Sequence, residues 1–113
     1  MYQHCDMHQA LDSSITDEPG IYVEGRVGVR IENTLLCVPS RETDFGRFLR
    51  FETLTLCPYD LRAVERDMLT PDEVEQINAY HMVVRRRLMP LLTDEADKIW
   101  LARATASIED DRG

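Results

Sequence analysis

Strand-forming and helix-forming residues separate along the chain. Residues 14–57 are rich in β-branched and aromatic side chains interrupted by glycines, a pattern typical of strands. Residues 70–105 have apolar side chains at intervals of three and four and predict two helices. The pattern therefore predicts an α+β fold, in which an incomplete antiparallel sheet over 14–57 precedes a helical C-terminal extension over 58–113. Residues 1–13 are polar and without periodicity, and we expect them to be disordered.

The first strands predict a hairpin. The stretch EGRVG is typical of a turn, because Gly25 can adopt a positive φ. If the hairpin is centred on Gly25, the numbers of paired residues sum to fifty. Ile21 then faces Val29, and Val23 faces Val27.

After this hairpin we expect a polar connection, PSRETDFGR, and one further strand, FLRFETLTL. Pro58 should end that strand, because proline has no N–H for a sheet. Cys37 and Cys57 lie in apolar strand contexts and are predicted to be thiols of the core.

The start of the first helix is the clearest local feature of the chain. In the sequence Thr70-Pro71-Asp72-Glu73, threonine caps the helix, proline follows, and glutamate stands three residues after the cap. This is a capping box. The helix should run to about Met89, because Pro90 cannot continue it. One face should carry the stripe Val74, Ile77, His81, Val84, Leu88 and Leu91.

A second, shorter helix is predicted from a cap at Thr93 to about Ala104. It should bury one of three consecutive residues, Ile99, Trp100 or Leu101. On the first helix, His81 is interpreted as a hydrogen-bonded packing histidine. The run 85–87 (Arg-Arg-Arg) is interpreted as a solvated face or as a partner for the many acidic side chains.

The same register rule places two glutamates, Glu18 and Glu32, opposite each other. Facing residues of an antiparallel pair have Cβ atoms about 4.5–5.5 Å apart, so two ionised carboxylates there repel each other. Protonation of one, a cation between them, or a different register would relieve the repulsion. Pro19 can bend the strand, and a slip of one residue would put the glutamates on opposite faces. From spacing alone, two solvated strand glutamates are the commoner case.

Composition excludes several classes of function. The formal net charge is -8, with 21 acidic and 13 basic residues, which argues against binding to nucleic acid or to an anionic membrane. The apolar runs are too short to span a bilayer, and the N-terminus has no features of a signal peptide. Three cysteines without such a signal favour free thiols, so we expect a cytoplasmic protein.

The stretch TDEPGIYVEGRVGVRIENTLL resembles the closing strands of the aminopeptidase P family, which has the pita-bread fold of methionine aminopeptidase and creatinase. The family motif is an acidic residue, Glu-Pro-Gly, a short hairpin and Arg-Ile-Glu, matched here by 17–20 and 30–32. FETLTLCPYDLRAV resembles the junction with the C-terminal tail. LTPDEVEQINAYHMVV and IWLARAT resemble the helical extension. The resemblance covers about residues 14–106.

This resemblance implies a role for three residues. Glu18 matches a glutamate that ligates one metal ion and is proposed to shuttle a proton. Glu32 matches the glutamate that bridges two ions, and Arg30 matches an arginine that orients the ligands. The implied cofactors are two divalent ions, usually manganese, and the implied substrate is a peptide with proline in second position. In the family's long branch the helical extension lies at a dimer interface, which implies a homodimer.

The chain also departs from the family. The family's ligand set is two aspartates, one histidine and two glutamates, and the first three lie upstream of the segments present here. We therefore expect this chain alone to lack aminopeptidase activity. The alternative is a non-catalytic remnant that acts as a dimerisation or interaction module. A cluster of His4, Cys5 and His8 could bind zinc, but a structural zinc site needs four ligands.

Overall fold

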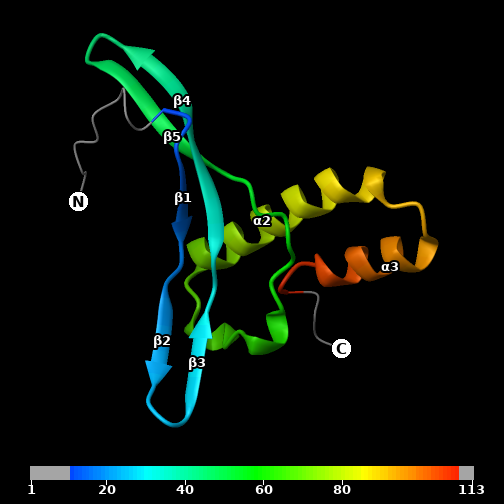
Figure 1. The fold of residues 1–113 in the computed structure, drawn as a ribbon. Helices are drawn as coiled ribbons and strands as arrows, with labels where there is room; N and C mark the ends of the chain where they lie inside the picture. Colours follow the sequence, from blue (N-terminus) through cyan, green and yellow to red (C-terminus); the bar gives the residue numbers. More distant parts are fainter. Residues whose placement is uncertain (1–10, 110–113) are drawn as a thin grey trace. The chain divides into compact units, whose positions relative to one another are not determined.

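A computed structural model describes residues 11–109 of the chain. The chain forms two compact units, which divide between Thr55 and Leu56. Within the described residues, the first unit consists of antiparallel strands, and the second contains two α-helices (Figure 1). The α+β class is confirmed, and the sheets are open rather than closed.

The first unit contains a three-stranded sheet and a two-stranded ribbon. The sheet has the order β1 (Ser14–Asp17), β4 (Asn33–Thr43) and β5 (Gly46–Thr53). The ribbon pairs β2 (Gly20–Val23) with β3 (Val27–Arg30). Figure 1 shows that the ribbon continues β1 and β4, so that one long hairpin runs through both sheets.

The predicted register is confirmed in the ribbon. Ile21 pairs with Val29, and Val23 pairs with Val27. Gly25 has a φ of 69°, and the N–H of Arg26 donates to the carbonyl oxygen of Val23 at 3.0 Å. A positive φ at the third position of a hydrogen-bonded turn is the geometry that favours glycine. The turn therefore centres the hairpin where the sequence predicts.

The same register continues beyond a break at Pro19. β1 pairs with β4 from Ser14 opposite Leu36 to Asp17 opposite Asn33. Between the two ladders, the N–H of Ile31 donates to the carbonyl oxygen of Pro19 at 3.4 Å. Proline cannot return a second bond, so the ladder is interrupted there without a change of register.

The predicted polar connection is wrong. The strand β4 continues through Pro39 to Thr43, and only two residues separate it from β5. A shift in register between Pro39 and Arg41 leaves Ser40 without an opposite residue, as in a β-bulge. A bulge is one of the few places where a strand can contain proline. The pairing also reaches back to Asp12, whose N–H donates to the carbonyl oxygen of Cys37 at 3.0 Å.

The second unit is helical. It comprises the 3₁₀ turns η1 (Leu61–Ala63), η2 (Arg66–Met68) and η3 (Met89–Leu91), and the helices α2 (Pro71–Leu88) and α3 (Glu95–Ala104). The predicted capping box is present at the start of α2. In the part of the chain that the structure describes, no helix is both long and apolar enough to cross a membrane.

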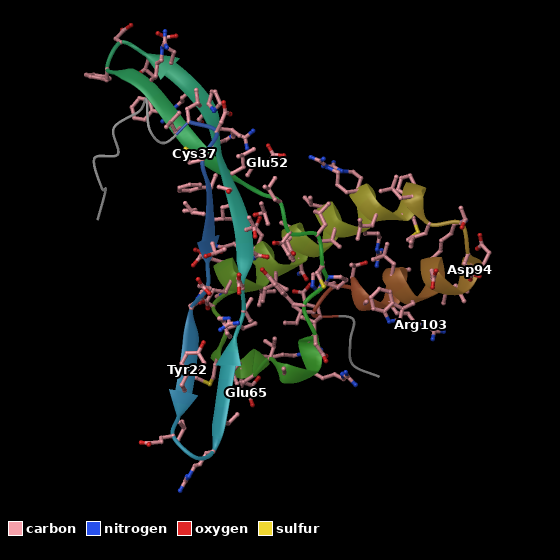
Figure 2. The ribbon with its side chains drawn as sticks, viewed as in Figure 1. Tyr22, Cys37, Glu52, Glu65, Asp94 and Arg103 are labelled. Carbon is pink, nitrogen blue, oxygen red and sulfur yellow. The ribbon has the colours of Figure 1, made fainter. Side chains whose placement is uncertain are left out.

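Two details of the helical prediction are corrected. His81 and Val84 are buried as predicted, but Leu91 is 74% exposed because the stripe ends with α2. The helix α3 is capped by Asp94 rather than Thr93, because the Asp94 carboxylate accepts the N–H of Ala96 at 2.7 Å. Figure 2 shows Asp94 at the start of α3.

Two further predictions concern which apolar side chains are buried. Of the three candidates on α3, Leu101 is buried, whereas Ile99 and Trp100 are 52% and 62% exposed. Of the two described cysteines, Cys37 is buried as predicted, but Cys57 is exposed because β5 has already ended before it. Cys57 is therefore not a thiol of the core.

Candidate functional site

The candidate residues lie on one face of the ribbon. Arg30 pairs with Gly20, and Gly28 pairs with Tyr22. Side chains alternate between the two faces of a strand, whereas directly paired residues share a face. Gly20, Tyr22, Gly28 and Arg30 therefore lie on the same side, and Figure 2 labels Tyr22 on β2.

Glu18 and Glu32 flank this face just beyond the ribbon's ladder. The Nε atom of Arg30 lies 4.0 Å from a carboxylate oxygen of Glu18 and 3.4 Å from one of Glu32. Both carboxylates thus approach the same nitrogen, and both belong to the register that continues on either side of Pro19. Arg30 is the cation that relieves their repulsion in this structure. We still predict, as a separate point, that the carboxylate oxygens of Glu18 and Glu32 lie close enough together for metal ions to bridge them.

Tyr22 is a member of this site that the sequence analysis missed. Its hydroxyl accepts a hydrogen bond from Nη1 of Arg30 at 3.2 Å. Its ring lies over two glycines: a Cβ at Gly20 would come within 2.6 Å of the Tyr22 hydroxyl, and one at Gly28 within 2.7 Å of the ring. The two glycines facing one tyrosine in GIYVEGRVG could have indicated this packing, because only glycine leaves the space.

The electrostatics of the site concern Arg30. The hydrogen bond and charge interaction with Tyr22, followed by the negative charges of Glu32 and Glu18, raise the pKa of Arg30 above its ordinary value. The side chains of Arg30, Glu18 and Glu32 are 49%, 51% and 40% exposed. Exposed ion pairs contribute little to stability, so these contacts orient the carboxylates more than they hold the hairpin together. A second hydrogen bond orients Glu18, which accepts the Thr16 hydroxyl at 2.9 Å.

The carboxylate oxygens of Glu18 and Glu32 are hard ligand atoms of the kind that Mn²⁺ and Mg²⁺ accept. They fit part of a metal site only, because residues 11–109 contain no group of three or more histidine, cysteine, aspartate or glutamate side chains that could hold an ion. The cluster at 4–8 lies outside the described residues. Any further ligands would therefore have to come from other segments.

The other residues weighed from the sequence lie in the second unit. His81 is buried and accepts the N–H of Tyr59 at 3.0 Å, which confirms a packing histidine. Arg85 is not simply solvated: it donates to the Thr105 hydroxyl at 2.8 Å and to the carbonyl oxygen of Ala102. Both acceptors lie at the C-terminal end of α3, where a cation is favourable, and the Thr105 hydroxyl itself donates to the carbonyl oxygen of Leu101 at 2.6 Å.

Comparison with known proteins decides the family. The family model described as the C-terminal region of peptidase_M24 matches residues 47–108. This chain belongs to that family. It is 38% identical over 99 residues to aminopeptidase P1 of Lotus japonicus, covering 84% of this chain and 15% of that protein. It is 31% identical over 107 residues to Xaa-Pro aminopeptidase 2 of Sus scrofa, covering 92% of this chain and 16% of that protein.

A solved structure also resembles this member of the peptidase M24 family. It is the crystal structure of X-prolyl aminopeptidase from Caenorhabditis elegans, described as a cytosolic enzyme with a di-nuclear active site. The match has a TM-score of 0.71 at 31% identity and covers 83% of this chain and 16% of the other. The chain therefore spans about one sixth of the length of the relatives it matches. The resemblance to aminopeptidase P found in the sequence is confirmed.

Proposed function

We propose that this chain supplies two carboxylate ligands, Glu18 and Glu32, to the dinuclear metal centre of an Xaa-Pro aminopeptidase. The observation that carries the proposal is their convergence on Arg30 from one side of the hairpin. Two carboxylates with a shared cation are the arrangement that a bound metal ion would also stabilise. The relatives' names and the di-nuclear neighbour support the same function.

Each residue has a distinct role in this proposal. Glu18 and Glu32 would hold the metal ions, Glu18 would also pass a proton, and Arg30 would fix the orientation of the two carboxylates. Tyr22 in turn fixes the guanidinium of Arg30 through its hydroxyl. The bound ions, for which we propose manganese, would lower the pKa of a water molecule and polarise the scissile carbonyl.

The substrate and the setting follow from the relatives. We propose peptides with proline in second position as substrates, and the cytosol as the location, as for the Caenorhabditis elegans enzyme. Residues 14–57 would belong to the catalytic domain and residues 58–113 to its helical extension. The two glutamates fall within the first of these segments.

Manganese binding followed by NMR tests the proposal on the chain as it exists. Mn²⁺ broadens the signals of nuclei near it, so amides around Glu18 and Glu32 should broaden first in a titration. Replacing Glu32 by glutamine should weaken this local broadening, because an amide is a poorer ligand than a carboxylate. Glu42→Gln is the matched control, since Glu42 lies in the same unit and pairs with Arg47 at 3.6 Å. Broadening centred elsewhere, or unchanged by Glu32→Gln, would contradict the proposal.

A second candidate function is association of two copies through the helical extension. The observation that favours it is the exposure of Ile99 and Trp100 on α3. Large exposed aromatic residues are common at the centres of protein interfaces. Sedimentation should then show a dimer that Trp100→Ala weakens and Phe45→Ala does not, since Phe45 is an exposed aromatic residue of the other unit. A monomer at all concentrations would exclude this role.

A further inference from the structure

A buried histidine ties an irregular segment to α2. The side chain of His81 is 1% exposed, and its Nε2 accepts the backbone N–H of Tyr59 at 3.0 Å. A ring nitrogen can accept only when it carries no proton, so the folded unit requires neutral His81 with its proton on Nδ1. Among the described residues Nδ1 has no hydrogen-bond partner.

The neighbouring residue of α2 holds the same segment by contacts that do not titrate near neutral pH. The hydroxyl of Tyr80 donates to the carbonyl oxygen of Cys57 at 2.9 Å and accepts its N–H at 3.3 Å. The rings of Tyr80 and Tyr59 stack with centroids 4.6 Å apart. Burial raises the pKa of Tyr80, which keeps its hydroxyl protonated. Compared with Tyr80, His81 is the side chain that changes charge between pH 5 and 8.

The segment held in this way is one wall of a groove. Pro58, Tyr59 and Leu61 line one side, and Trp100 and Ala104 of α3 line the other. The groove is open to solvent and has a volume of about 440 Å³. His81 and Tyr80 of α2 hold this segment, and α3 forms the facing wall, so a displacement of the segment changes the width of the groove.

We propose that His81 is a pH-sensitive switch: the neutral ring holds residues 57–61 against α2, and a proton on Nε2 releases them and widens the groove. The protonated ring presents a donor to the N–H of Tyr59, which is also a donor. Two buried donors that face each other lose a hydrogen bond and leave both groups unsatisfied. The segment would then keep its contacts with Tyr80 but lose the hydrogen bond to His81.

The surroundings of His81 oppose its charged form. Burial is the first cause that lowers its pKa below 6.5, and the positive charge of Arg85, one turn along α2, lowers it further. The backbone of Ala106, which is the second-largest cause and exceeds the effect of Arg85, raises the pKa of His81. The rings of Tyr59 and Tyr80 also face His81, with centroids 5.8 Å and 6.1 Å from the centre of its ring.

The direction of the pH effect follows from this shift. Because the folded pKa is lowered, the unfolded chain binds the proton more readily at pH values around 6.5 and below. The contribution of His81 is therefore complete above pH 6.5 and is lost as the pH falls through its folded pKa. Release of the segment is expected on the acidic side only.

The test follows two reporters between pH 7.5 and 4.5. NMR gives the proton uptake of His81 and the hydrogen-exchange protection of the Tyr59 amide. Below the folded pKa, that protection should fall by about tenfold per pH unit, in step with the neutral fraction of the ring. Trp100 is the single tryptophan of the chain and lines the opposite wall, so its fluorescence should change with the same midpoint.

Two variants separate the switch from general acid unfolding. In His81→Gln the side-chain oxygen can accept the Tyr59 N–H without titrating, so both reporters should stay constant over this range. Tyr80→Phe should weaken the segment at every pH without moving the midpoint. The proposal is overturned if the Tyr59 amide stays protected after His81 is charged, or if His81→Gln shows the same transition. If His81→Gln does not fold, the unaltered chain still decides. The proposal is supported if His81 protonation and loss of Tyr59 amide protection have the same midpoint pH, and it is overturned if the two midpoints differ.

Discussion

Replacement of Val84 by alanine should markedly lower the free energy of unfolding of the second unit, although it removes only two methyl groups. Val84 is 0% exposed on α2. Removing two methyl groups from a buried position costs about 1.6 kcal/mol in transfer free energy, at about 0.8 kcal/mol per carbon. The cavity adds about 1 kcal/mol, and the better helix propensity of alanine returns about 0.5 kcal/mol. We therefore expect a loss of about 2 kcal/mol, equivalent to a fall in Tm of roughly 10 °C for a domain of this size.

The neighbouring Val83 provides a matched control. It has the same residue type on the same helix, but it is 37% exposed. The propensity gain is the same in Val83→Ala, so the difference between the variants isolates burial. Urea unfolding followed by circular dichroism at 222 nm reports on α2 and α3. If Val83→Ala destabilises as much as Val84→Ala, or if the difference is below about 0.5 kcal/mol, the described packing of α2 is wrong.

The remaining predictions concern catalysis, acid stability and the end of α3. The purified chain with manganese should release no N-terminal residue from an Xaa-Pro dipeptide, and release abolished by Glu32→Gln would refute this. Hydrogen bonds from Thr70 lower the pKa of Glu73, so the capping box should stabilise α2 above pH 4.5 and lose this effect as the pH falls. Glu73→Gln should flatten the dependence of helix content on pH between 3 and 5, and a curve identical to that of the unaltered chain would count against the box. Arg85→Lys should lower the free energy of unfolding by about 2 kcal/mol, measured by thermal unfolding, because lysine cannot reproduce both hydrogen bonds to the end of α3. Arg86→Lys, at an exposed position, should cost almost nothing. Equal losses in the two variants would contradict a stabilising role for Arg85.

Features that depend on a few consecutive residues were determined by the sequence itself. The start of α2 follows from Thr70 and Glu73, which bond to each other's backbone three residues apart. The hairpin register follows from Gly25, because one turn residue with positive φ fixes every pair on either side. The same register places Glu18 opposite Glu32. These interactions are local, so no distant segment is needed to specify them.

Other features were decided only by the tertiary structure, because they depend on what packs against a residue from far along the chain. Ile99, Trp100 and Leu101 are similar in hydrophobicity, and only the packing of α3 selects Leu101 for burial. The accommodation of Pro39 within β4 depends on a bulge opposite β5, and the sequence of β4 alone does not show it. The site at Arg30 likewise includes Tyr22, whose ring has space only because a glycine lies across the ribbon from it. Propensity and periodicity describe one segment at a time, whereas burial and close contact are properties of two segments together.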